Sequence, residues 1–169
     1  SESGKLMGIP NLTLPEAAES DFNLPRNTFD ECIQQIVSDT EKAIELLPLD
    51  YGDVANSDAI PAKFKTLGVT LHGDFNRVNG NLMKGRITGR IAEAIRSQAA
   101  LLAASPAYSE GTSVTWQTAA DYAAIVLDHI GGVAGLDPTG GTWYANTAEI
   151  NGLASGANPK EILWRSDKS

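Results

Sequence analysis

Three stretches of this chain repeat apolar side chains at intervals of three and four residues, and this period restricts the fold more than any other feature. In the first stretch, residues 28–47, the apolar or small side chains are Phe29, Ile33, Ile36, Val37, Thr40, Ala43, Ile44 and Leu47. This spacing follows the turn of an α-helix and places these side chains on one helical face. Because such a face must be buried against another element, the sequence predicts a protein of packed helices.

The first stretch also carries the signals that begin and end a helix. Thr28 and Glu31 have the spacing of a capping box, in which each side chain accepts a hydrogen bond from the other residue's backbone N–H. Pro48 follows the stretch and stops a helix there. We therefore expect a helix over residues 28–47.

Two further helices are expected in the second half of the chain. The stretch 87–105 is rich in alanine, which favours the helix and lets a neighbouring helix approach closely, and Pro106 ends it. The stretch 116–130 has its own apolar stripe and is closed by the glycines at 131 and 132. Because a short connector separates the two helices, we expect them to pack antiparallel as a hairpin, the unit of tetratricopeptide arrays.

The remaining segments are less periodic. Residues 1–27 contain three prolines and predict an extended or irregular lead-in. Residues 48–85 predict an irregular segment with one short helix or hairpin, and residues 161–165 have the length and flanks of a short strand. Because the apolar run 162–164 stops so close to the end of the sequence, we expect the chain to be a piece of a longer protein.

Composition excludes several classes of protein. The net charge of −8 disfavours general nucleic-acid binding, which needs an electropositive face. A lone cysteine, Cys32, excludes a disulfide within the chain and a zinc site of paired cysteines, and it is expected to be a half-buried thiol on a helix. No run approaches the roughly 18 apolar residues that a membrane-spanning helix needs.

Charge is distributed unevenly along the sequence. Residues 63–96 carry seven basic and two acidic side chains, whereas the segments on either side are acidic. These basic side chains are expected to pair internally or to be solvated; the alternative is that they steer an anionic glycan or an acidic partner.

Three stretches in this order resemble the SusD/RagB family of outer-membrane nutrient-binding lipoproteins. They are Arg26–Ile33 continuing to Ala43–Pro48, then Gly85–Gly89 leading to Leu101–Tyr108, and finally Trp116–Ala120 with a closing Glu161–Trp164. The segment 85–108, which ends in Ala-Ala-Ser-Pro-Ala-Tyr, is the most specific of them. The resemblance extends over about residues 26–169.

The resemblance implies an all-α fold of tetratricopeptide-like helix pairs with long irregular loops and minor strand content. Residues 28–169 would form the SusD-like helical domain after the lead-in 1–27. The resemblance also implies a surface-exposed protein of the outer membrane, held by a lipid anchor that this chain lacks. Such a protein captures a glycan or another nutrient and passes it to a TonB-dependent, SusC-like barrel transporter, with no catalysis and no cofactor. A competing interpretation is a helical-repeat scaffold that binds only proteins and no small molecule.

Sugar recognition needs flat apolar faces for pyranose C–H groups and polar groups for the hydroxyls. Trp143, Tyr144 and Asn146 supply both within a glycine-rich segment after the third helix, so they are the candidate ligand-binding residues. The alternative is that the two aromatic rings anchor this segment to the helices. A second such combination comprises Tyr51, Asp53 and Asn56, for which a structural role is the favoured interpretation; Trp116 and Trp164 are interpreted as packing residues.

The sequence offers no catalytic constellation. The two histidines, His72 and His129, are far apart, and His129 is expected at the surface near the end of a helix. The acidic residues 50, 53 and 58 lack the alternating spacing of a calcium loop, so no metal site is expected. Neither a nucleophile elbow nor a phosphate-binding loop is found.

Overall fold

The structure is a computed structural model that describes residues 4–138, 152 and 162–164. In these residues the α-helices are α1 (Phe29–Leu46), α2 (Ala62–Thr66), α3 (His72–Asn79), α4 (Gly89–Ala104) and α5 (Trp116–Asp128). Short 3₁₀ turns accompany them at Ser57–Ala59, Asn81–Met83, Ser109–Gly111 and Gly132–Gly135. Among the described residues, β pairing is limited to one isolated antiparallel bridge between Met7 and Thr28, so the expected all-α fold is confirmed.

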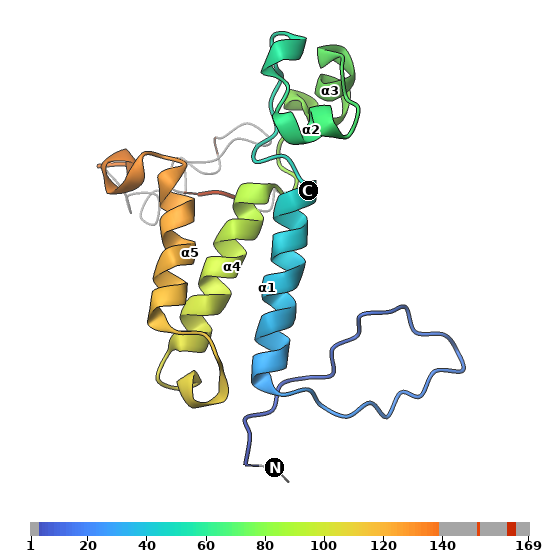
Figure 1. The fold of residues 1–169 in the computed structure, drawn as a ribbon, viewed down its shortest axis with the longest axis vertical. Helices are drawn as coiled ribbons and strands as arrows, with labels where there is room; N and C mark the ends of the chain where they lie inside the picture. The colour runs from blue at the N-terminus through green and yellow to red at the C-terminus, as the bar shows by residue number, and fades with distance from the viewer. Residues whose placement is uncertain (1–3, 139–151, 153–161, 165–169) are drawn as a thin grey trace.

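The three long helices lie side by side, with α4 between α1 and α5 (Figure 1). Each helix runs antiparallel to its neighbour, so α4 and α5 form the predicted hairpin (Figure 1). Helix α1 packs against α4 on the side away from α5 (Figure 1). The predicted ranges 28–47, 87–105 and 116–130 agree with the observed helices to within two residues at each end. Kinship with tetratricopeptide repeats stays a prediction.

A threonine caps the start of each long helix. At α1 the Glu31 N–H donates to Thr28 Oγ1 at 3.2 Å and the Thr28 N–H donates to Glu31 Oε2 at 2.7 Å, which confirms the capping box. Thr88 and Thr115 accept the equivalent backbone hydrogen bonds at α4 and α5. The cap at Thr88 explains why α4 begins at residue 89 rather than at 87, since the N-cap residue itself is extended.

The main core lies where the alanine-rich face of α4 meets α1 and α5. Its buried residues are Ile33, Ala100, Ala103, Ala104, Val114 and Ala119, with Phe29 and Tyr122 packed against them. Ala100 and Ala103 are completely inaccessible, because small side chains allow the helix backbones to approach closely. The alanines that favoured a helix in the sequence therefore also decide how tightly the three helices pack.

The segment between α1 and α4 is more regular than the sequence suggested. It forms two short helices, α2 and α3, over a small second core of Ile60, Phe64 and Phe75. The rings of Phe64 and Phe75 meet edge to face at 5.2 Å between centroids. Their spacing follows no single period because the two rings come from different helices, and this is why the expectation of an irregular segment with one short helix was wrong.

The lead-in is extended, as expected from its prolines. It leaves the end of the bundle at which α1 begins and returns to that helix (Figure 1). The two arms meet where the Gly8 N–H donates to the Asn27 carbonyl at 2.8 Å and Arg26 Nη2 donates to the Met7 carbonyl at 3.0 Å. Cys32 is half-buried on α1, also as expected, and its thiol donates to the Ile9 carbonyl at 3.3 Å.

Two expectations near the later aromatic residues are wrong. The described part of the predicted strand, Ile162–Trp164, is not a β-strand. Instead, the Trp164 indole N–H donates to the Gly85 carbonyl at 3.0 Å. Trp164 and Trp116 are 49% and 56% exposed, so neither is a core packing residue. Trp116 is the first residue of α5, whereas the buried residue of this helix is Ala119, three positions later.

In the described ranges, no helix combines the length and the apolar character needed to cross a bilayer.

Candidate functional site

The residues predicted to bind a ligand, Trp143, Tyr144 and Asn146, lie outside the described residues. The continuous described part of the chain ends at residue 138. Beyond α5 it turns at Gly131, whose φ of +84° is in the left-handed region that glycine adopts readily, and then forms the turn Gly132–Gly135. The assignment of these three residues as a ligand site stays a prediction.

Of the second candidate group, Tyr51, Asp53 and Asn56, the two polar side chains have structural roles in the loop that follows α1. The Asp53 carboxylate accepts hydrogen bonds from the Asn81 N–H at 2.9 Å and the Asn81 side-chain amide at 2.8 Å. Asn56 caps the first 3₁₀ turn by accepting from the Ala59 N–H at 3.1 Å. The favoured structural interpretation is therefore confirmed for these two polar side chains.

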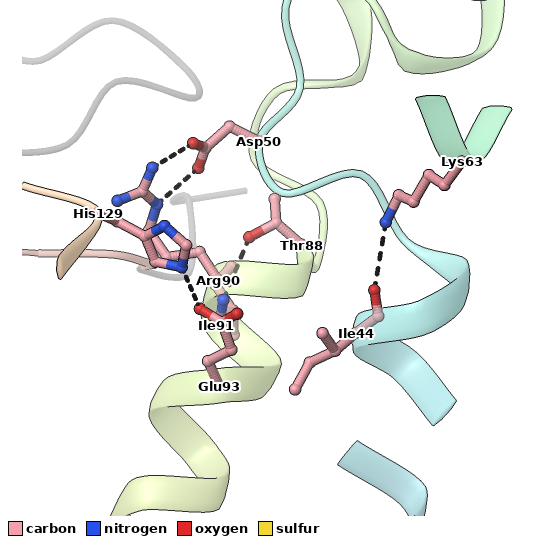
Figure 2. Close-up of polar contacts among 8 residues, drawn as sticks. All are labelled: Ile44, Asp50, Lys63, Thr88, Arg90, Ile91, Glu93 and His129. Atoms are coloured by element: carbon pink, nitrogen blue, oxygen red, sulfur yellow. Dashed lines mark hydrogen bonds and ion pairs between the residues drawn. The ribbon is translucent and has the colours of Figure 1, made fainter. Parts of the chain in front are cut away.

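A polar cluster occupies the end of the bundle where α4 begins (Figure 2). His129 Nε2, just past the end of α5, lies 2.6 Å from Glu93 Oε2 on α4. Glu93 is only 6% exposed, so this contact supplies a partner to a carboxylate that burial would otherwise penalise. His129 is exposed near the end of α5, as expected, and the fold adds a contact with Glu93, 36 positions away, that the sequence did not indicate.

Arg96, on the same helix as Glu93, is a second buried charged residue of the bundle. It is 8% exposed, its guanidinium lies 4.3 Å from the centre of the Tyr122 ring, and Nη1 is 3.7 Å from Glu41 Oε1. Its Nε has no hydrogen-bond partner in the described part of the chain. Arg96 thus links α4 to both neighbouring helices through one ring contact and one long ion pair.

The basic side chains of residues 63–96 are mostly paired within the protein. Arg90 forms a two-pronged contact with Asp50, with Nε 3.0 Å from Oδ1 (Figure 2). Lys65 donates to the Asp58 carbonyl at 2.8 Å, and Arg77 lies 3.6 Å from Asp74. The expectation of internal pairing is confirmed for these side chains, whereas Lys84 and Arg86 are exposed.

Lys63 caps the C-terminal end of α1. Its Nζ donates to the Ile44 carbonyl at 3.2 Å (Figure 2) and also to the Leu47 carbonyl. These carbonyls lie at the negative end of the helix dipole, where a cation is favoured. Burial lowers the pKa of Lys63, and the charge of Glu93 opposes this shift without cancelling it.

An open cleft of about 730 Å³ lies at the opposite end of the bundle. It is bounded by residues 4–6 of the lead-in, the start of α1 and the connector 106–113 between α4 and α5. The side chains that give this cleft its chemical character are Lys5, Asp30, Tyr108, Glu110, Thr112 and Ser113.

Asp30 connects the start of α1 to the far connector. Its Oδ1 accepts hydrogen bonds from the Ser113 N–H at 2.8 Å, the Ser113 hydroxyl at 2.9 Å and the Thr112 hydroxyl at 3.1 Å. Partial burial raises the pKa of Asp30, but these hydrogen bonds, together with one from Gln34, outweigh it and lower the pKa overall. Asp30 therefore presents an ionised carboxylate at the wall of the cleft.

Beside this carboxylate, Tyr108 lines the cleft and its ring stacks on Phe29. The rings of Phe29 and Tyr108 lie 5.0 Å apart between centroids and 18° from parallel. Sequence reasoning did not find this cleft, because Asp30 and Ser113 are 83 positions apart. The available signal was an aspartate in the first turn of a helix and a connector rich in hydroxyl side chains.

The arrangement of the helices and the cleft defines a class of protein. A layer of three antiparallel helices carries the short helices α2 and α3 at one end and an open polar cleft at the other. Among the described residues there is no group of three or more ligating side chains that could hold a metal ion. This is an all-α scaffold whose loops and connectors are the surfaces available for binding.

Comparison with known proteins finds a similarity to a family model over part of the chain. Residues 5–62 match the SusD-like family model described as "Starch-binding associating with outer membrane". The match supports membership of this chain in the SusD/RagB family, over a stretch of about a third of its length. The matched stretch includes most of the lead-in 1–27, whereas the resemblance noted in the sequence began at about residue 26. The match does not extend to the segment 85–108. No curated protein and no solved structure matches the chain.

Proposed function

We propose that this chain is part of a non-enzymatic component of the outer membrane that binds glycans at the cell surface. The observation that carries the proposal is the family match over residues 5–62, whose description names both starch binding and the outer membrane. The all-α fold agrees with what the resemblance implied. In this proposal the full-length protein is held by a lipid and delivers its ligand to a TonB-dependent barrel transporter.

The long helices would serve as the rigid part of this receptor, and loops would contact the ligand. Trp143 and Tyr144 would offer ring faces to a pyranose, and Asn146 would bond to its hydroxyls.

Isothermal titration calorimetry with malto-oligosaccharides tests the proposal. We expect saturable binding that Trp143→Ala weakens by about tenfold or more, since aromatic anchors dominate such interfaces. Trp116→Ala is the matched control, because Trp116 is also an exposed tryptophan but lies at the start of α5. Equal losses from both variants would contradict the assignment of Trp143, and a glycan array with no binding would contradict the function.

A protein-only scaffold is the second candidate, and the exposed apolar face of α4 favours it. Ile95, Leu101 and Leu102 are large apolar side chains of this helix that remain largely accessible. Copurification with a TonB-dependent barrel transporter, combined with no glycan binding, would identify this function instead. Copurification together with glycan binding would support the receptor.

A further inference from the structure

We propose that the cleft between residues 4–6 and the connector 106–113 binds one neutral glycosyl unit. This inference rests on the proposed function and gives it a site within the described residues, separate from the predicted residues Trp143, Tyr144 and Asn146.

The size and composition of the cleft suit a sugar ring. Its volume of about 730 Å³ is within the roughly 300–1,000 Å³ of small-molecule sites. The Tyr108 ring and Pro106 supply apolar surface for pyranose C–H groups, and Thr112 and Ser113 supply hydroxyls beside it. The hydroxyls of Thr112 and Ser113 already bond to Asp30, and the carboxylates of Asp30 and Glu110 add acceptors for the hydroxyls of a ligand.

The groups that would contact the ligand are held in place before it binds. Phe29 stacks on the ring of Tyr108, and three hydrogen bonds from Thr112 and Ser113 hold the Asp30 carboxylate. An ionised carboxylate is an acceptor for the hydroxyl donors of a sugar, and such charge-assisted hydrogen bonds are the stronger kind. Because these groups are already ordered, less conformational entropy is lost on binding.

The charge of the lining selects neutral sugars over anionic ones. Asp30 and Glu110 are acidic, and Lys5 is the basic side chain among the lining residues. The charge of Lys5 also contributes to the lowered pKa of Glu31, so Lys5 interacts with a carboxylate outside the cleft lining as well. A uronate or sulfate in the cleft would meet a net negative wall.

The lead-in approaches the connector closely because residue 111 is glycine. A Cβ at Gly111 would lie 2.8 Å from the Leu6 Cβ, which is closer than real side chains approach. The connector 106–113, which lines the cleft, precedes α5, whereas residues 129–138 follow the other end of that helix (Figure 1). Trp143→Ala and the cleft variants change different residues, so the two assignments can be tested with separate variants.

Calorimetry on the complete 169-residue chain with maltohexaose, a neutral probe, and hexagalacturonate, an anionic probe, tests the inference. We expect Tyr108→Ala to weaken maltohexaose binding by about fivefold or more. Glu110→Lys reverses the net charge of the lining, and we expect it to strengthen hexagalacturonate binding by about fivefold. Glu110 is exposed, so this second variant keeps the test valid if Tyr108→Ala unfolds the protein.

Glu16→Lys is the matched control, since it makes the same change in net charge at an exposed position of the lead-in outside the cleft. A gain in hexagalacturonate binding with Glu110→Lys but not with Glu16→Lys supports the cleft. Maltohexaose binding that neither cleft variant alters overturns the cleft and leaves the proposed function standing. No maltohexaose binding by the parent chain also overturns the cleft, and binding of other glycans on an array would then preserve the proposed function.

Discussion

Replacing Asp30 by alanine should destabilise the protein by disconnecting the start of α1 from the connector between α4 and α5. The substitution removes the acceptor of three hydrogen bonds, which come from the Ser113 N–H, the Ser113 hydroxyl and the Thr112 hydroxyl. It also removes a negative charge from the first turn of α1, where the helix dipole favours one.

The magnitude follows from the number and exposure of these bonds. Each contributes about 1 kcal/mol net, and the charge near the helix terminus adds about 0.5 kcal/mol. Ser113 is exposed and can bond to water in the variant, which offsets part of the loss. We therefore expect Asp30→Ala to lower the free energy of unfolding by about 2 kcal/mol at neutral pH. Asp30→Asn keeps an oxygen acceptor and should lose about half as much.

The pH dependence gives an independent check. Because the folded pKa of Asp30 is lower than its unfolded pKa, its stabilising contribution is complete above the unfolded value. It is lost as the pH falls from about 4 through the lower folded pKa. The difference in stability between the parent chain and Asp30→Ala should therefore shrink in acid.

Urea denaturation followed by circular dichroism, at neutral pH and at about pH 3, measures these differences. Asp39→Ala is the control, since Asp39 is an exposed aspartate of the same helix that bonds only to Gln35, four residues away, among the bonds described. The reasoning is refuted if both variants lose the same stability, or if the loss in Asp30→Ala is as large in acid as at neutral pH.

Three further predictions concern helix packing, the contact between Glu93 and His129, and the first cap. Ala103→Leu places a large side chain at a fully buried position and should cost about 1–3 kcal/mol in thermal or urea unfolding, whereas Ala120→Leu on the exposed face of α5 should be nearly neutral. A double-mutant cycle of Glu93→Ala and His129→Ala should give a coupling free energy of about 1–2 kcal/mol, and additive losses would show that their contact contributes nothing. Thr28→Ala should lower the unfolding free energy by about 1 kcal/mol, and an unchanged urea midpoint would argue against the capping box.

The long helices and their ends could be predicted from the sequence because their determinants are local. The period of the apolar side chains in 28–47, the spacing of Thr28 and Glu31, and the prolines at 48 and 106 all act through bonds and contacts within a few residues. The glycines at 131 and 132 belong to the same kind of signal, since both have positive φ in the turn after α5. The alanine-rich stretch also indicated a close helix neighbour, and the hairpin of α4 and α5 confirms it.

Other features depended on residues that are distant in the sequence. The carboxylate of Glu93 meets His129, and Asp30 accepts hydrogen bonds from Thr112 and Ser113, only after α1, α4 and α5 have packed. The rings of Phe64 and Phe75 similarly define a small core through two helices that share no common period. In each case the pairing depends on a rotation and a separation of helices that no local pattern encodes.

The sequence by itself determined where the long helices begin and end and which of their faces are apolar, because hydrogen bonds four residues apart and neighbouring side chains control both. Only the tertiary structure decided which carboxylates are buried, which are paired, and where a cleft opens. The physical reason is that the desolvation of a charge and the shape of a cavity depend on every element packed around them, and these elements come from distant parts of the chain.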